Sequence, residues 1–359
     1  MDIHIVRTLP TEDWRRFVDG HPHGNIFHTP EIFQVFARTR GYRPELWAAV
    51  TGDSQIMALL LPVQVTLGGN FTSFMTTRSV AYGSVLHDLS PTGEEGLAVL
   101  LNTYVHEVGH KTLFTELRNL SDLSPIQPVL NQHGFIYEDH LNYLLNLDCS
   151  PDDILRGIGR RTRKHIRRGL RSGEVVIKEI VGREQISLCY DLLRKTYATA
   201  QVPLADQSLF GATFDTLYPR GMVKFFTAWI GEACVATSVD LVYKDTIYGW
   251  YGSVDREYIA YMPNELLMWH ILQWGSENGY HVYDFGGAGK PNEKYGVRDF
   301  KAKFGGRLVN YGRNIRIHAR WRMGVSVRTY QLARKALLLL KSISARHSSG
   351  NTSPETETE

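Results

Sequence analysis

The chain has 359 residues, of which 43% are hydrophobic and 21% charged, a composition typical of globular proteins and a length that suits two domains. No run of about 18 apolar residues occurs, and the first residues lack the apolar core of a signal peptide, so we expect neither a membrane-spanning helix nor a secretory leader. The net charge is +3.

That small net charge conceals an asymmetry between the halves. Residues 1–150 hold 9 Lys and Arg against 16 Asp and Glu, whereas the remainder holds 31 against 21. A basic second half indicates contact with an anionic partner. Unevenly placed charges on solvated helices would give the same totals, so the charge balance leaves both interpretations open.

Two stretches predict similar hairpins. Residues 46–65 and 225–242 each contain a β-rich run, a glycine followed by an acidic residue, and a second β-rich run. A Gly-acid pair between such runs is typical of a two-residue hairpin turn, here at Gly52 and Gly231. The two copies are offset by 179 residues.

Two later stretches also correspond. Residues 100–119 and 266–287 each show a helical pattern that ends at a glycine, Gly109 or Gly279, and then runs into a strand. Their offset of 170 residues differs from that of the hairpins only by loop length. We therefore predict a duplicated α/β unit with a boundary near Ser150-Pro151.

One stretch in the first copy, "HEVGH" at residues 106–110, fits the zinc-protease pattern H-E-x-x-H. The pattern needs both histidines inside one helix, so that their rings converge on the metal. By comparison with the second copy, we expect His106 in the last helical turn, Gly109 as the stop and His110 beyond it. A third ligand is missing, because Glu116 falls in a strand pattern. We interpret the match as accidental and expect no metal.

The cysteines give no sign of a metal site or a disulfide. Cys149, Cys189 and Cys234 are odd in number, lie far apart and form no C-x-x-C pair. Such usage indicates a reducing compartment, so we expect a cytoplasmic protein.

The second half opens with its most basic segment. Residues 156–171 carry eight positive charges, and five of them share one helical face. Such a stripe suits contacts with phosphates that do not depend on base sequence, although a solvated helix face has the same spacing. The members of this basic stripe are Arg160, Arg163, Lys164, Arg167 and Arg171.

The most unusual segment is "YDFGGAGKPNEKYGVRDFKAKFGG", residues 283–306. We expect a strand that ends on Asp284 and opens into a loop with Gly286, Gly287 and Gly289. In open α/β sheets, ligands gather where strands end and where glycines let them approach the backbone. An ordinary surface loop is the alternative.

A helical turn is expected to follow this loop. Phe300 and Phe304 lie four residues apart and would anchor one face of the turn. Lys301 and Lys303 stand between them, and we expect both lysines to point at the site.

The order of these motifs resembles the FemAB/FemX family, aminoacyl-tRNA-dependent transferases that build peptidoglycan cross-bridges and consist of two tandem GNAT-like domains. The likeness rests on "YDFGG", "FKAKFGG" and "RLVNYGRNIRI", on "NIFHTPEIFQVFARTRGYRP" as the first helix, and on "RRTRKHIRRGLRSGEVVIKEI" as the start of the second domain. It covers about residues 20–320 and extends to GNAT-like proteins encoded with polysaccharide synthesis genes. The resemblance implies an α/β fold with mixed sheets and two tandem GNAT-like (acyl-CoA N-acyltransferase-like) domains, 1–150 and 151–320.

The resemblance also implies roles for individual residues. By family position, Lys301 would stabilise the carbonyl oxygen that gains charge, or the departing ribose oxygen. Asp284 would orient the nucleophile or brace the glycine loop, and no residue stands out as a general base. Family members that use a UDP-linked muropeptide carry a lysine late in the first helix, where this chain has Arg38 and Arg40. We expect substrate contacts from Lys303, Arg163, Arg167, Gly286, Gly287, Tyr251 and Arg38.

The donor is argued from a missing glycine motif. A CoA-dependent GNAT enzyme holds pyrophosphate on backbone N–H groups of a [Q/R]-x-x-G-x-[G/A] loop. Here the equivalent loop has Ile259 and Tyr261 at the small positions after Arg256, which disfavours acyl-CoA. We predict transfer of an aminoacyl or acyl group from an activated ester, preferably aminoacyl-tRNA, to an amine or hydroxyl of a cell-envelope precursor or polysaccharide, without a cofactor. An acyl-CoA-dependent N-acyltransferase and a non-catalytic GNAT-like binding protein remain the alternatives.

The C-terminal residues suggest a peripheral role. Residues 321–346 form a basic amphipathic pattern that would pack on the domain or rest on an anionic membrane surface. Residues 347–359 are polar and predicted to be disordered.

Overall fold

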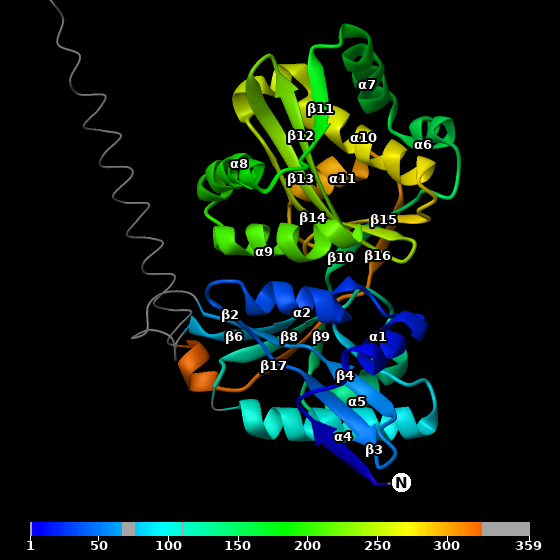
Figure 1. The fold of residues 1–359 in the computed structure, drawn as a ribbon, viewed down its shortest axis with the longest axis vertical. Helices are drawn as coiled ribbons and strands as arrows, with labels where there is room; N and C mark the ends of the chain where they lie inside the picture. The colour runs from blue at the N-terminus through cyan, green and yellow to red at the C-terminus, as the bar shows by residue number, and fades with distance from the viewer. Residues whose placement is uncertain (1, 67–75, 110, 325–359) are drawn as a thin grey trace, which may run out of the picture.

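The computed structural model describes residues 2–66, 76–109 and 111–324. Figure 1 shows two α/β bodies stacked along the long axis, the first in blue and cyan below, the second in green and yellow above. The first body contains β1 (Ile3–Val6), α1 (Thr11–Gly20), α2 (Pro30–Ala37), β2 (Tyr42–Pro44), β3 (Trp47–Thr51), β4 (Ile56–Leu60), β5 (Val63–Val65), β6 (Arg78–Ala81), β7 (Val85–His87), α4 (Pro91–Val108), β8 (Phe114–Arg118), α5 (Gln127–Gln132), β9 (Ile136–Glu138) and, from the end of the chain, β17 (Arg313–Ile317). The second body contains β10 (Leu141–Asn146), α6 (Pro151–Gly157), α7 (Arg160–Ser172), β11 (Val175–Glu179), α8 (Ile186–Ala200), α9 (Gln207–Leu217), β12 (Val223–Ile230), β13 (Ala233–Tyr243), β14 (Thr246–Val254), α10 (Pro263–Glu277), β15 (Val282–Gly287), α11 (Gly296–Ala302) and β16 (Arg307–Asn310).

The sheets are mixed, as predicted. In the described residues, the first body has a four-stranded sheet in the order β1-β3-β4-β7 and a six-stranded sheet in the order β2-β5-β6-β8-β17-β9. The second body has one seven-stranded sheet in the order β11-β12-β13-β14-β15-β10-β16. Each body contains a parallel pair, β6 with β8 and β14 with β15, and a long helix precedes the second strand of each pair. The predicted duplication of an α/β unit is therefore confirmed.

Both predicted hairpins are present. β12 and β13 are joined by the two-residue turn at Gly231, whose φ of +56° is readily adopted by glycine. In the first body, β3 and β4 pair from Trp47 opposite Leu60 onward. Their turn is longer than the two residues predicted, because β3 ends at Thr51 and β4 begins at Ile56, and Ser54 takes the left-handed conformation in it.

The long helices α4 and α10 cover the sheets because their apolar residues recur every three or four positions. In α4, Leu97, Leu101 and Tyr104 are fully buried against the first sheet. In α10, Ile271 and Leu272 are fully buried against β12, β13 and their neighbours. Burial of each such side chain contributes about 1.5–3 kcal/mol to folding.

The "HEVGH" stretch lies at a helix end, as predicted. Helix α4 ends at Val108, so His106 is in its last turn, and Gly109 lies outside it. Gly109 keeps a right-handed conformation with φ of −55°, so the stop is not the left-handed glycine cap that the pattern suggested. His110 lies outside the described residues.

Two strands cross between the bodies. β10 precedes residue 150, yet it pairs with β15 and β16 in the second sheet. The predicted closing strand "RLVNYGRNIRI" is in fact two strands: β16 stays beside β10, whereas β17 pairs with β8 and β9 in the first body. Each body thus receives one strand from the far side of residue 150, which ties them together. The division into domains at residue 150 remains a proposal.

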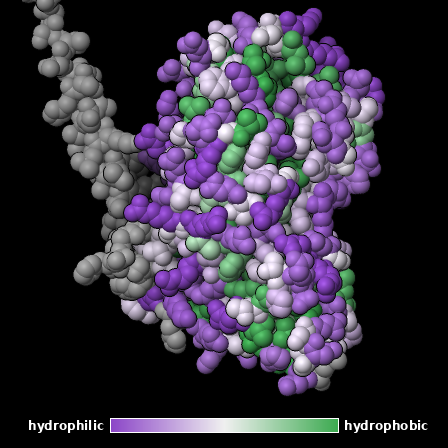
Figure 2. Space-filling view, in the orientation of Figure 1, coloured by the Kyte–Doolittle hydropathy of each residue, from purple (hydrophilic) through white to green (hydrophobic). Residues whose placement is uncertain are grey.

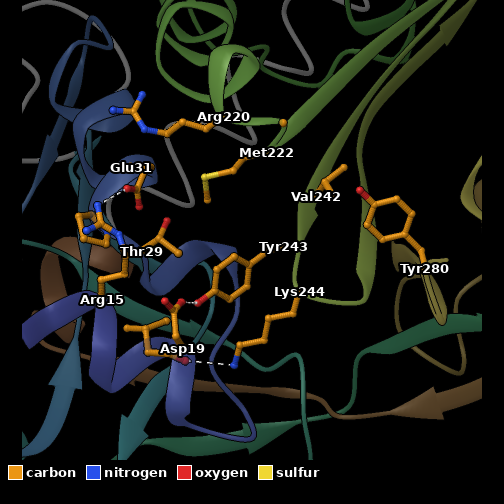
Figure 3. A pocket seen from close by; sticks show the side chains of 13 residues that line it. Arg15, Asp19, Thr29, Glu31, Arg220, Met222, Val242, Tyr243, Lys244 and Tyr280 are labelled. Atoms are coloured by element: carbon orange, nitrogen blue, oxygen red, sulfur yellow. Dashed lines mark hydrogen bonds and ion pairs between the residues drawn. The ribbon is translucent and has the colours of Figure 1, made fainter. Parts of the chain in front are cut away.

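A crevice of about 330 Å³ separates α1 and the start of α2 from the β13–β14 turn (Figure 3). Contacts between the bodies close its lower side: the Tyr243 hydroxyl donates to Asp19, and Lys244 Nζ donates to the carbonyls of Val18 at 3.1 Å and His21 at 2.8 Å. None of the residues predicted to form the active site lines this crevice.

The surface seen in Figure 2 is mostly hydrophilic, with separate hydrophobic patches in each body. Among the described residues, no helix is long and apolar enough to cross a membrane. Of the predicted amphipathic segment 321–346, only residues 321–324 are described, and the predicted disordered end lies outside the described residues.

Candidate functional site

The glycine loop begins where two parallel strands separate. β14 pairs with β15 only as far as Tyr248 opposite Asp284, whereas β15 continues beside β10 until Gly287 lies opposite Asn142. The strand therefore does not end on Asp284, as the sequence suggested, because it continues beside β10 through a register shift to Gly287.

Two positions of this loop favour glycine for different reasons. Gly286 has φ of +69°, and a Cβ there would lie 3.1 Å from the carbonyl oxygen of Gly249. A Cβ on Gly287 would lie 2.8 Å from Nε2 of His140. The left-handed conformation favours glycine at position 286, whereas a larger residue at position 287 would displace the end of the His140 side chain.

Lys301 extends from α11 to this loop. Its ammonium group donates to the carbonyl oxygens of Phe285, Gly286 and Gly287, the last two at 3.2 and 2.8 Å. Burial lowers the pKa of Lys301 to about 8, although the nearby Asp284 carboxylate acts in the opposite direction. The ammonium thus uses all three hydrogens to hold the loop.

Asp284 holds the same loop from its N–H side. Its carboxylate is buried and accepts hydrogen bonds from the Gly286 N–H at 2.7 Å and from the Asn142 side chain at 3.3 Å. Burial raises the pKa of Asp284 to about 6, against the effect of these donors and of Lys301. Orienting the nucleophile and bracing the glycine loop were the two roles suggested for Asp284, and these contacts agree with the second.

The two lysines of "FKAKF" do not lie together. Phe304 is fully buried and packs edge-on against Phe300, with 5.1 Å between ring centroids, as their spacing predicted. Lys303 is exposed and lies 3.7 Å from the carboxylate of Glu265 on α10. Lys303, the C-cap of α11, keeps helical backbone angles, and residues two apart on a helix do not face the same side, so Lys303 points away from the loop that Lys301 contacts.

Two other predicted contacts lie near the boundary between the bodies. Tyr251 on β14 packs edge-on against Phe210, with 4.9 Å between ring centroids, and burial raises its pKa. Arg38 is exposed at the C-terminal end of α2, and Arg40 donates its backbone N–H to the Ser208 hydroxyl at 2.8 Å. Helix α2 packs on α9 here, so the C-terminal end of α2 lies against the second body.

The predicted basic stripe forms helix α7. Thr162, Ile166 and Gly169 are buried, and Gly169 permits close packing because a Cβ there would lie 2.6 Å from the Leu266 side chain. Arg167 is exposed, whereas Arg163 is half-buried and donates to the backbone carbonyl of Arg156 at 2.7 Å. Arg163 therefore supports the junction of α6 and α7, and the freely exposed stripe members are Arg160, Lys164, Arg167 and Arg171.

The start of α7 lies beside the turn that carries the lysines. The Gly159 N–H donates to the carbonyl of Lys303 at 3.0 Å, and a Cβ on Gly305 would lie 3.0 Å from the Gly157 carbonyl. The basic stripe thus begins next to α11 and extends away from it, so a long anionic substrate on α7 could place its end near the glycine loop.

The segment before α10 differs from a pyrophosphate-binding loop. Residues Arg256–Tyr261 form a 3₁₀ helix, in which the Glu257 N–H donates to the Asp255 side chain and the Tyr258 N–H to the Asp255 carbonyl. Pro263, the first residue of α10, has no N–H to donate. The N–H groups of Glu257 and Tyr258 are thus engaged within this segment, which also lacks the glycines of a pyrophosphate-binding loop.

Sequence reasoning missed a charged cluster on the other side of the glycine loop. Glu116 is buried and accepts hydrogen bonds from Arg118 and Arg313, and Arg313 also donates to Nε2 of His140 at 2.8 Å. Burial, and next Arg313, lower the pKa of His140 to about 4. In the sequence, Glu116 and Arg118 alternate in one strand pattern and Arg313 lies in another, far along the chain. The pairing of β17 with β8 brings these residues together.

The described residues contain no group of three or more His, Cys, Asp or Glu side chains placed to hold a metal ion.

Comparisons with known proteins identify the fold. Residues 159–301 match the family model of the acetyltransferase (GNAT) domain. The crystal structure of FemX superposes over 92% of this chain and 99% of its own length, with a TM-score of 0.69 and 16% sequence identity. No curated protein matches the chain.

Two further solved structures have the same architecture. A tandem GNAT protein from the clavulanic acid biosynthesis pathway covers 88% of this chain and 97% of its own, with a TM-score of 0.55 and 11% identity. The structure of L-PGS from Bacillus licheniformis covers 86% and 92%, with a TM-score of 0.53 and 14% identity. The predicted tandem GNAT-like fold and its likeness to FemX are confirmed, and the match to the acetyltransferase (GNAT) domain model lies in the second body.

Proposed function

We propose that this tandem GNAT-fold protein transfers an aminoacyl group from the ester of an aminoacyl-tRNA to an amine or hydroxyl of a cell-envelope precursor or polysaccharide. The observation that carries the proposal is the Lys301 ammonium group, held at the glycine loop by three carbonyl oxygens. The fold shared with FemX supports the reaction class, and the role of Lys301 follows from the sequence resemblance to that family.

In this reaction, the acceptor nitrogen or oxygen attacks the ester carbonyl and forms the new bond. The bond between that carbonyl and the donor's ribose oxygen breaks, and the proton lost by the nucleophile ends on the departing hydroxyl. Negative charge builds on the carbonyl oxygen and then on the ribose oxygen. A cation fixed at the loop stabilises both, since it needs little reorganisation in a site that excludes most water.

Lys301 must release one contact to donate directly to substrate. Its three hydrogens already bond to carbonyls, and the bond to Gly286 is the longest, at 3.2 Å. We propose that this bond exchanges for the substrate oxygen while the other two keep the ammonium in place. Asp284 would hold Gly286 through its N–H during the exchange.

The choice of donor is supported by two observations. The exposed arginines and lysine of α7 offer phosphate contacts along a helix that begins beside Lys303. The 3₁₀ helix before α10 uses its own backbone N–H groups where a CoA-dependent enzyme would present them. Transfer from acyl-CoA is the second candidate, because the GNAT domain model and the fold are common to enzymes that use it.

We also propose that the protein works in the cytoplasm, where aminoacyl-tRNA is available, and contacts the membrane peripherally. The basic amphipathic pattern of residues 321–346 supports this placement, since cationic amphipathic segments bind anionic lipid surfaces. Lipid-linked acceptors would be accessible there.

Lys301→Met tests the proposal, with Lys303→Met as its matched control. Radiolabelled aminoacyl-tRNA would serve as donor, with a UDP-linked muropeptide and a bacterial envelope lipid extract as acceptor probes. We expect transfer by Lys301→Met to fall by about 10²–10³-fold, whereas Lys303→Met retains most activity. Unchanged transfer by a Lys301→Met protein that circular dichroism shows to be folded would refute the catalytic assignment.

A further inference from the structure

Three arginines gather on the face of the six-stranded sheet that looks toward the glycine loop. Arg118 on β8 lies directly opposite Arg313 on β17, and Glu116 lies two residues before Arg118 on the same face. β6 runs parallel to β8 with Val80 opposite Glu116, so Arg78, two residues before Val80, points the same way. We call Arg78, Arg118 and Arg313 the arginine cluster.

The arginine cluster has more positive charge than its surroundings neutralise. Like charges directly opposite each other on neighbouring strands repel, and Glu116 compensates by accepting from both Arg118 and Arg313. Glu138 lies opposite Arg313 on the other neighbouring strand, but Lys290 binds it at 2.8 Å. Within the described residues, Glu116 is thus the carboxylate that forms ion pairs with Arg118 and Arg313.

The arginines are only partly covered by protein. The side chains of Arg118 and Arg313 are 30% and 27% exposed, whereas Glu116 is 6% exposed. The Arg118 guanidinium lies over the ring of Tyr82, 4.9 Å from its centroid, which fixes its plane. Nε of Arg78 is buried without a hydrogen-bond partner among the described residues. Desolvated donors of this kind are costly unless an acceptor reaches them.

The arginine cluster adjoins the glycine loop at Gly287. Nη2 of Arg313 lies 3.7 Å from the position that a Cβ on Gly287 would occupy. It donates to Nε2 of His140, which must be deprotonated there to accept, in agreement with its low pKa. A group bound to Arg313 would therefore lie close to Gly287, whose carbonyl oxygen accepts a hydrogen bond from Lys301.

We propose that the arginine cluster binds an oxyanion carried by the acceptor, a phosphoryl or carboxylate group, and thereby positions the nucleophile at the glycine loop. This inference rests on the proposed transferase function and specifies its acceptor. Guanidinium groups present paired N–H donors that match both kinds of oxyanion. The donor's phosphates have a separate surface on α7, so the two anionic substrates would reach the loop from different elements.

The test is titration calorimetry of the full-length protein with pyrophosphate, inorganic phosphate and N-acetylglycine at low ionic strength. Pyrophosphate and phosphate probe the phosphoryl source, and N-acetylglycine probes the carboxylate. We expect saturable binding of one class, weakened roughly ten- to hundredfold by Arg118→Gln. Arg307→Gln, an equal loss of charge at an exposed position on β16, should leave it unchanged.

Glu116→Gln is expected to change the affinity for the probe in the opposite direction. The change keeps the shape of the side chain but removes the charge that competes with a ligand for Arg118 and Arg313, so binding of the same probe should tighten. A purely structural cluster would lose stability in this variant without any gain in affinity. Arg118→Lys keeps the charge but removes the paired N–H donors of the guanidinium, so it should also weaken binding. This variant replaces Arg118→Gln if the Arg118→Gln protein does not fold.

The outcomes separate this inference from the proposed function. Absence of saturable binding, or equal binding by wild type, Arg118→Gln and Arg307→Gln, overturns the oxyanion site whatever the activity of Lys301→Met. Loss of transfer in Lys301→Met together with such a result would keep the transferase and reject its acceptor site. Probe binding that depends on Arg118, with transfer unaffected by Lys301→Met, would keep the anion site and reject the assigned chemistry.

Discussion

Lys301 and Asp284 hold the same glycine from its two ends: Asp284 accepts the Gly286 N–H at 2.7 Å, and Lys301 donates to the Gly286 carbonyl at 3.2 Å. Burial shifts both pKa values toward neutrality, that of Lys301 down to about 8 and that of Asp284 up to about 6. Each charge lessens the shift that burial imposes on the other. The conformation of the loop therefore depends on whether Lys301 and Asp284 are charged.

This coupling predicts a pH profile for transfer. Above about pH 8, Lys301 loses the proton that gives it charge, so stabilisation of the oxyanion declines. Below about pH 6, protonation of Asp284 weakens its hydrogen bond to Gly286, so the loop loosens. We expect transfer to be greatest between these values, measured as kcat/KM across the range at constant ionic strength.

Asp284→Asn separates this effect from titration of the acceptor itself. Its amide oxygen can still accept the Gly286 N–H, but the charge that raises the pKa of Lys301 is gone. We expect the acid limb to disappear and the alkaline limb to move below its wild-type position. The acceptor is the same in both proteins, so an unmoved alkaline limb would contradict the assignment to Lys301.

Gly286→Ala should impair the site beyond its effect on stability. Gly286 and Gly221 have nearly equal φ values, +69° and +68°, so alanine costs roughly 1–2 kcal/mol in conformation at either position. A Cβ on Gly286 also crowds the Gly249 carbonyl at 3.1 Å, whereas one on Gly221 meets nothing within 4 Å. We expect Gly286→Ala to lose more stability on thermal unfolding and most of its transfer activity.

Gly221→Ala is the matched control for that comparison. It should lose about the same conformational stability and keep its transfer activity at a temperature where it is folded. Equal activity of the two alanine variants would show that the glycine loop tolerates displacement.

Charge reversal on α7 tests the donor. Lys164→Glu with Arg167→Glu removes two exposed cations, and Arg163 is spared because it supports the α6–α7 junction. If tRNA binds there, we expect weaker binding for every tRNA sequence and a smaller salt dependence, by about 0.7–0.9 in log-log slope for each phosphate that is no longer neutralised. Filter binding across a salt series measures both.

The matched control reverses Arg194 and Lys195 on α8, with the same change in net charge. This control should bind tRNA as the wild type does. Thermal shift with CoA completes the comparison, because a ligand that binds the folded state raises its melting temperature. Clear stabilisation by CoA with no tRNA affinity would overturn the preferred donor.

The sequence by itself determined the local units of this protein. The glycine turns and the periodicity of apolar residues are local properties, so the hairpins, the helices α4 and α10 and the repeat that relates them could be predicted. The same holds for Gly286 and for the anchoring pair of Phe300 and Phe304, because a positive φ and a four-residue spacing leave marks in the sequence.

Only the tertiary structure decided how the strands pair across the bodies. Nothing in the alternation of β10 or β17 tells which sheet it joins, because alternation shows which face of a strand is buried and not which strands lie beside it. That pairing extends β15 beyond Asp284 and sets Arg118 opposite Arg313. Helix geometry alone turns Lys301 and Lys303 to different sides, but only the packing of α11 decides that Lys301 contacts the glycine loop and Lys303 contacts Glu265.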